Sequence, residues 1–290
     1  MTRPRPFKKA LTAAEFDSFL LNHGAASWPR TAVLFDLHFP NHDPAFWGAT
    51  LAFLTWLKPD CLVLDGDAVD NAAFNPHKKG KAAVKRGAVQ AQIEAVRPYF
   101  LALRQAVGPE CRIIYLKGNH EDWTEKWVHE EAPELEGLEC VTLPALLGLS
   151  AADLKIEWVG DKRGEQPIRL GEGVGSVKIL HGHNFKGGGQ FPAKKLVEVY
   201  GESGVTILCG HFHRDQVFVK EMDPHPTTGM VVGCGRDLDP DWYGEPKTWG
   251  HRLAVIDQLP GRRAKVTVLN GDDGAIVYGA RVFYGPRERA

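Results

Sequence analysis

Residues 61–70 read CLVLDGDAVD, in which an apolar run, Cys61–Leu64, is followed by Gly66, Asp67 and Asp70. A short apolar run bounded by glycine is typical of a strand buried on both faces, as in a parallel sheet. The stretch therefore predicts a central strand that presents carboxylates at its carboxyl end.

The same arrangement occurs on both sides of this stretch. Upstream, the apolar run Thr31–Phe35 ends at Asp36, and downstream Arg112–Leu116 leads into Asn119. Apolar residues at helical spacing lie between these runs, so the order is β-α-β-α-β. That order predicts a parallel sheet covered by helices, with the polar residues meeting in one crevice at the carboxyl ends of the strands.

Further strands are expected in the second half of the chain. Ser176–Leu180 and Val205–Cys209 each end at a histidine motif. The strand-like segments between Gln216 and Phe283 predict an antiparallel second sheet. Within the helix expected at 82–107, Pro98 predicts a kink or a division.

Composition limits the classes of protein to consider. The chain has 290 residues, 43% hydrophobic and 24% charged, which is enough for a substantial core. We expect one domain over 1–290, with a helical extension over 1–28 and a cap or insert over 122–160. The net charge of −1 gives no global attraction for nucleic acid. Scattered cysteines with no Cys-x-x-Cys pair favour a reducing, cytoplasmic location, and no membrane-spanning stretch or signal peptide is expected.

The motifs supply oxygen and nitrogen donors suited to divalent cations. The oxygen donors are Asp36, Asp67 and Asn119, and the nitrogen donors are His38, His181, His211 and His213. A mixed set without thiolate suits Mn, Fe, Zn, Co or Ni better than Ca or Mg alone. Two such ions clamp a phosphoryl group and lower the pKa of a water between them. The sequence therefore predicts two divalent metal ions, and Mn is the ion we expect.

In this order, the motifs resemble those of the calcineurin-like metallophosphoesterases. They are D-x-H at 36–38, G-D-x-x-D at 66–70, G-N-H-E at 118–121, H-G-H at 181–183 and G-H-x-H at 210–213. The resemblance implies an α/β fold that is a four-layer αββα sandwich, with two mixed β-sheets flanked by helices.

The resemblance also implies a role for each motif residue. One ion would be bound by Asp36, His38, His213 and a shared Asp67, and the other by Asp67, Asn119, His181 and His211. His120 would not be a ligand but would stabilise the transition state or protonate the leaving group. Asp70 and Glu121 would orient the ligands or hold His120. His183 fits either a substrate contact or a solvent-facing turn.

The function we expect is a metal-dependent phosphoesterase that hydrolyses phosphodiesters or phosphomonoesters by direct attack of metal-bound hydroxide. Its substrate would be a small molecule or a nucleic acid. Phe39 and Asn71 stand where protein phosphatases of this family have glycine and arginine, so the pattern is more similar to phage-type and bacterial phosphodiesterase-like members. Two alternatives stay open. One is a nuclease-like enzyme acting on DNA or RNA, which the basic run Lys78–Arg86 weakly supports. The other is a non-catalytic scaffold of the same fold.

Overall fold

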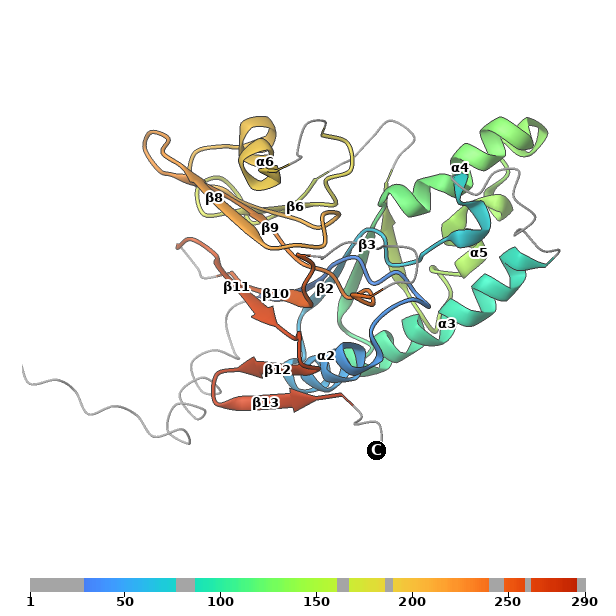
Figure 1. Cartoon of the computed structure of the whole chain (residues 1–290), viewed down its shortest axis with the longest axis horizontal. Coiled ribbons are helices and arrows are strands. Elements are labelled where there is room, and N and C mark those ends of the chain that lie inside the picture. Colours follow the sequence, from blue (N-terminus) through green and yellow to red (C-terminus); the bar gives the residue numbers. More distant parts are fainter. Residues whose placement is uncertain are drawn as a thin grey trace, which may run out of the picture.

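The computed structural model describes residues 29–76, 87–160, 167–185, 190–239, 248–258 and 262–285. The helical extension expected over 1–28 and the basic run Lys78–Arg86 lie outside the described residues. In the described part of the chain, two mixed sheets and their flanking helices form an α/β fold (Figure 1). Among the same residues, no helix is both long and apolar enough to cross a membrane.

The first sheet carries the three strands that the sequence predicts around Asp36, Asp67 and Asn119. Its order is β11 (Lys265–Asn270), β10 (Arg252–Asp257), β1 (Arg30–Leu34), β2 (Cys61–Asp65), β3 (Arg112–Leu116) and β4 (Ile156–Val159). Strands β1 to β4 run parallel, and β10 pairs antiparallel with β1. Both faces of β1 to β3 are buried, which explains their unbroken apolar runs.

The second sheet carries the two histidine motifs. Its order is β5 (Ile168–Leu170), β6 (Val177–Leu180), β7 (Thr206–Cys209), β9 (Thr227–Val231) and β8 (Gln216–Lys220). Strands β6, β7 and β9 are parallel, and the edge strands β5 and β8 are antiparallel to their neighbours. Like the first sheet, it is therefore mixed.

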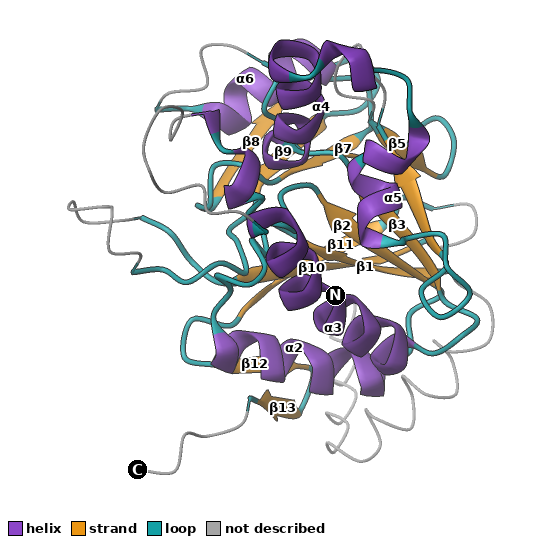
Figure 2. Ribbon diagram, turned by 90° about the vertical axis from the view of Figure 1, so that its right-hand side faces the viewer, coloured by secondary structure: helices purple, strands orange, loops and turns teal. Residues whose placement is uncertain are grey.

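Three apolar clusters define the layers. One lies between the sheets and joins Val33 and Val63 of the first sheet to Ile179 and Leu208 of the second. A second cluster packs α2 (Pro44–Leu57), α3 (Ala88–Val107) and α5 (Leu143–Leu147) on the outer face of the first sheet. The third packs α6 (Pro192–Tyr200) on the outer face of the second sheet. Figure 2 shows helices on the outer side of each of the two main sheets, so the predicted αββα sandwich is confirmed.

The predicted antiparallel second sheet over 216–283 is wrong in two respects. Strands β10 and β11 join the first sheet, and residues 275–284 form a separate hairpin, β12 (Ala275–Tyr278) with β13 (Arg281–Tyr284). The hairpin packs on α2, where Tyr278 and Phe283 contact Phe53. A buried strand is apolar whichever sheet it enters, so the sequence does not reveal its partner.

The segment between β3 and β4 is mainly helical. It contains α4 (Asn119–Glu131), α5 and two short 3-10 turns, Pro133–Leu135 and Glu139–Val141. β4 lies at the end of the expected insert and pairs with β3.

Pro98 does not divide helix α3, which is continuous over its 20 residues. The proline is exposed, and so is Glu94, whose carbonyl loses its helical hydrogen bond. Water can solvate that carbonyl, so the helix tolerates the missing bond.

Candidate metal centre

All five motifs follow parallel strands at their carboxyl ends. Asp36 follows β1, Asp67 follows β2 and Asn119 follows β3, while His181 and His211 follow β6 and β7. Because the carboxyl ends of both sheets lie at the same end of the sandwich, residues far apart in sequence meet there.

The backbone at these positions is unusual. Five of the predicted donors are non-glycine residues with positive φ, namely Asp36 (45°), His38 (51°), Asp67 (45°), His211 (67°) and His213 (58°). A non-glycine residue in this conformation costs about 1–3 kcal/mol, and such strain concentrates at functional sites. The sequence shows no sign of this strain. In the structure, the strained residues lie in the loops that carry the predicted donors. The shape of these loops is determined by the directions in which the donor side chains point.

The motif glycines permit close approach of neighbouring loops. A Cβ added at Gly118 would lie 2.3 Å from Asp67 Oδ1, and one added at Gly210 would lie 2.4 Å from Asp36 Oδ2. Both distances are far below van der Waals contact. Glycine is therefore required at these two positions by the carboxylates that pack against them.

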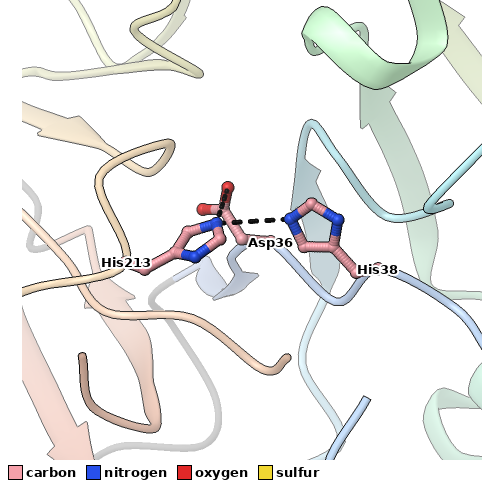
Figure 3. A group of neighbouring side chains, drawn as sticks. All are labelled: Asp36, His38 and His213. Atoms are coloured by element: carbon pink, nitrogen blue, oxygen red, sulfur yellow. Dashed lines mark hydrogen bonds and ion pairs between the residues drawn. The ribbon is translucent and has the colours of Figure 1, made fainter. Parts of the chain in front are cut away.

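The first donor cluster consists of Asp36, His38 and His213 (Figure 3). His213 Nε2 lies 3.2 Å from Asp36 Oδ1 and 3.2 Å from His38 Nε2. All three residues are buried. Asp36 Oδ2 accepts a hydrogen bond from the His211 N–H at 2.8 Å, whereas Oδ1 accepts none. A buried carboxylate oxygen that accepts no hydrogen bond is available to coordinate a cation.

The second donor cluster consists of Asp67, His181 and His211, whose donor atoms lie within 4.8 Å of one another. His181 Nε2 is 3.2 Å from Asp67 Oδ2 and 3.2 Å from Asn119 Oδ1. Asp67 Oδ2 is also 4.0 Å from His38 Nε2 of the first cluster. Asp67 thus lies between the two clusters, as a ligand shared by two ions must.

Hydrogen bonds fix which ring nitrogens can bind a cation. The carbonyl of Asp65 can only accept, so His181 Nδ1, at 2.7 Å, carries a proton, and Nε2 is the nitrogen that faces Asp67 and Asn119. His38 Nδ1 lies 3.2 Å from Asp70 Oδ1, which leaves its Nε2 facing His213. Lone pairs converging in a buried space repel one another unless a cation lies between them. The donor set therefore fits divalent metal ions.

Burial and charge favour the protonation states that ligands need. Burial lowers the pKa of His38 and of His211 to about 4, which keeps both imidazoles neutral at physiological pH. Burial alone would raise the pKa of Asp67, but His181 and His120 outweigh it and hold that pKa well below its usual value. Burial disfavours charge on His181 too, yet Asp67 and Asp36 raise its pKa well above the usual value. His181 is therefore the ligand that must lose a proton when a metal binds.

Glu121 supports the loop that carries Asp67. Its carboxylate accepts hydrogen bonds from the N–H groups of Asp67 (2.9 Å), Gly118 (2.8 Å) and Val69 (3.2 Å), and from the hydroxyl of Tyr115 (2.6 Å). Glu121 is buried, and burial together with the Asp67 carboxylate raises its pKa to about 7. These hydrogen bonds connect the loop that carries Asp67 to the start of α4.

Asp70 connects His38 to a residue that the sequence reasoning missed. Buried Arg236 places Nη1 3.1 Å from Asp70 Oδ1 and 3.2 Å from His38 Nδ1. Burial would raise the pKa of Asp70, but the hydrogen bond from His38 and the nearby charges bring it down to about 2. Arg236 follows β9, which is parallel to β7, so it too lies at the carboxyl ends of the strands. The expectation that functional residues lie at the carboxyl ends of parallel strands could therefore have identified Arg236.

His120 lies beside the two clusters with one nitrogen directed at them. Its Nδ1 donates to the carbonyl of Asp70 at 2.7 Å, and its Nε2 is 3.8 Å from Asp67 Oδ2. The ring packs on buried Trp123 with centroids 3.9 Å apart. Trp127, one turn further along, is 41% exposed and contacts Phe74. The Asp70 carbonyl and the Trp123 ring thus hold His120 in one orientation.

His183 lies at the edge of the site. It is half-buried, with its ring centroid 5.5 Å from that of His181 and 6.4 Å from that of His211. Burial lowers the pKa of His183 to about 3, so the ring is neutral. The site thus brings together the predicted donors with Asp70, His120 and Glu121, and His183 lies at its margin.

Comparison of the sequence with models of protein families gives no match, and comparison with curated proteins gives none either. Solved structures do show similarity. Vps29 of Entamoeba histolytica complexed with Zn²⁺ is 12% identical, with a TM-score of 0.43 over 88% of this chain and 97% of that chain. Vps29 of Chaetomium thermophilum is 13% identical, with a TM-score of 0.37 over 89% and 99%. Likenesses this weak assign no function, so the candidate site rests on its side-chain geometry.

Proposed function

We propose that this chain is a dinuclear-metal-dependent phosphoesterase that hydrolyses phosphodiesters or phosphomonoesters with water as the nucleophile. The observation that carries the proposal is Asp67 Oδ2, which lies 3.2 Å from His181 Nε2 and 4.0 Å from His38 Nε2. One buried carboxylate oxygen thus faces both donor clusters, as the ligand shared by two metal ions must.

Each cluster would bind one ion. Asp36, His38 and His213 would hold the first, and Asn119, His181 and His211 the second, with Asp67 shared. The donors are imidazoles, carboxylates and an amide, which suit Mn, with Fe, Zn, Co or Ni as alternatives. When bound, such ions supply Lewis-acid activation of water and neutralise charge on the phosphoryl group.

The protein's own part in the reaction would fall mainly to His120. The Asp70 carbonyl holds the proton on Nδ1, and Nε2 faces the donor clusters. A protonated Nε2 there can donate to the leaving oxygen of a phosphate ester or stabilise charge that develops on it. Asp70 and Glu121 would act by position, the first on His38 and His120 and the second on the Asp67 loop.

The proposal is tested by removing donors singly. Asp67→Asn keeps the shape of the side chain but weakens both metal sites, and His211→Ala removes one nitrogen of one site. We expect both variants to lose Mn-dependent hydrolysis of an aryl phosphodiester while their circular dichroism spectra match the wild type.

Matched controls separate loss of the site from general damage. Asp153→Asn changes an exposed carboxylate that pairs with Arg97, and His129→Ala changes an exposed histidine on α4. Both controls should retain wild-type hydrolysis. Full Mn-dependent activity in Asp67→Asn or His211→Ala would refute the proposed function.

A further inference from the structure

A pocket lies at the opposite end of the sandwich from the metal centre. It has a volume of about 770 Å³ and is lined by the loop 170–176, by His225 and Gln258, and by Arg262–Ala264. Ser176 immediately precedes β6, whereas His181 immediately follows it. A four-residue strand is ~13 Å long, so a small ligand in this pocket does not contact the metal ligands.

Main-chain contacts hold the walls of the pocket together. The Gly175 N–H donates to the Gly204 carbonyl at 2.8 Å, and the Ala264 N–H donates to the Gly175 carbonyl at 2.9 Å. A Cβ at Gly175, where φ is +89°, would lie 2.7 Å from Arg263 Cα. The loop and the arginine segment are thus in direct backbone contact, and the pocket is preformed.

Two arginines in the lining form no ion pair with the described part of the chain. Arg262 and Arg263 are exposed, and neither guanidinium forms an ion pair or hydrogen bond with any residue that the structure describes. By contrast, the nearby Arg169 pairs with Glu202, and Arg30 pairs with Asp257 at 2.6 Å. Among the described residues of the lining, one carries a carboxylate, Glu172. Two guanidinium groups against one carboxylate make the described part of the lining net positive.

The remaining lining suits an organic molecule. Leu170, Val174 and Ala264 supply apolar surface, while His225 and Gln258 supply polar groups. The volume lies within the range of small-molecule sites, which combine apolar walls with a few polar groups. A guanidinium matches the oxygens of a phosphate group by paired hydrogen bonds.

We propose that this pocket binds a small organic phosphate through Arg262 and Arg263, at a site separate from the metal centre. The inference is independent of the proposed hydrolytic function, because it uses none of the residues of the metal centre. The bound molecule would be a ligand of the far end of the sandwich and not the substrate.

The test is calorimetric titration of the full-length, metal-free protein with ADP and with inorganic pyrophosphate, using adenosine as the uncharged probe. Metal-free protein is used so that phosphate does not bind through ions at the other end. We expect ADP and pyrophosphate to bind and adenosine not to bind. Arg263→Gln should weaken ADP binding about tenfold or more, since it removes a charge-assisted hydrogen bond.

Two controls make the result specific. Lys265→Gln removes the same charge from an exposed side chain two residues away and outside the lining, and Asp67→Asn alters the metal centre only. Both should bind ADP as the wild type does. The inference is overturned if neither phosphate compound binds the wild type, if Lys265→Gln weakens binding as much as Arg263→Gln, or if Asp67→Asn abolishes binding.

Discussion

Gly118→Ala should damage the metal centre with a single added methyl group. At Gly118 φ is −99°, which alanine adopts freely, so the effect is purely steric. The new Cβ would lie 2.3 Å from Asp67 Oδ1, 2.5 Å from the Asp67 nitrogen and 2.8 Å from Glu121 Oε2. All three atoms belong to the loop that carries the shared donor or to the residue that holds it.

The size of the effect follows from these distances. Real Cβ atoms essentially never approach other atoms closer than 3.0 Å, so residue 118 and the Asp67 carboxylate must move apart by at least 3.0 − 2.3 = 0.7 Å. Metal–ligand distances tolerate shifts of only about 0.2 Å. Since Asp67 faces both clusters, we expect the affinity for both ions to fall by about 10–100-fold. Overpacking should also lower the free energy of unfolding of the metal-free protein by about 1–3 kcal/mol.

The assay is Mn²⁺ titration by calorimetry, together with urea unfolding of the metal-free protein. Gly137→Ala is the matched control, because its φ of +91° strains the alanine while the added Cβ has nothing within 4 Å. The control should lose about 1–2 kcal/mol of stability but no metal affinity. If Gly118→Ala binds Mn²⁺ as tightly as Gly137→Ala, the steric reasoning is wrong.

Three further predictions address other parts of the molecule. In His120→Ala both ions should still bind, but turnover should fall about 10²–10⁴-fold, with the largest loss for substrates that have poor leaving groups. Equal losses for good and poor leaving groups would contradict proton donation. Burial lowers the pKa of His211 to about 4, below its unfolded value of 6.5. Between these two pH values the unfolded chain therefore binds more protons than the folded chain. The metal-free wild type should therefore gain stability relative to His211→Ala as pH rises from about 4 to 6.5, and parallel urea-unfolding curves would contradict this. Burial raises the pKa of Cys61 to about 11, so iodoacetamide at mildly alkaline pH should label exposed Cys140 well before Cys61, as peptide mass analysis can show.

The positions of the metal donors could be predicted because they obey two simple rules. Buried parallel strands are apolar throughout, and their carboxyl ends meet at one edge of the sheet. The predicted strand Arg112–Leu116 coincides with β3, and Thr31–Phe35 differs from β1 by one residue at each end. Asp36, Asp67 and Asn119 could therefore be placed near one another without coordinates.

Sheet membership could not be predicted in the same way. β10 is buried along nearly its whole length, so its sequence carries no alternation that would indicate a partner. The structure pairs it with β1, which places the predicted second-sheet strand Leu253–Ile256 in the first sheet.

The sequence also could not predict the local details that bring the donor atoms close together. The left-handed backbone at His38 and His213 is accompanied by contacts between loops, in which the His38 N–H donates to the Asp67 carbonyl and the His213 carbonyl accepts from the Gly250 N–H. Arg236 was missed because it stands in no motif, although its position after β9 follows the rule that located the others. The pocket lined by Arg262 and Arg263 is formed by three segments that are distant in sequence, and no motif or spacing in the sequence predicts it.

The central claim is that Asp67 is shared by two metal ions, and anomalous diffraction from crystals grown with Mn²⁺ tests it most directly. We predict two anomalous peaks on either side of Asp67 Oδ2, one beside Asp36 and His213 and the other beside His181 and His211. A single peak, or ions that do not contact Asp67, would contradict the account.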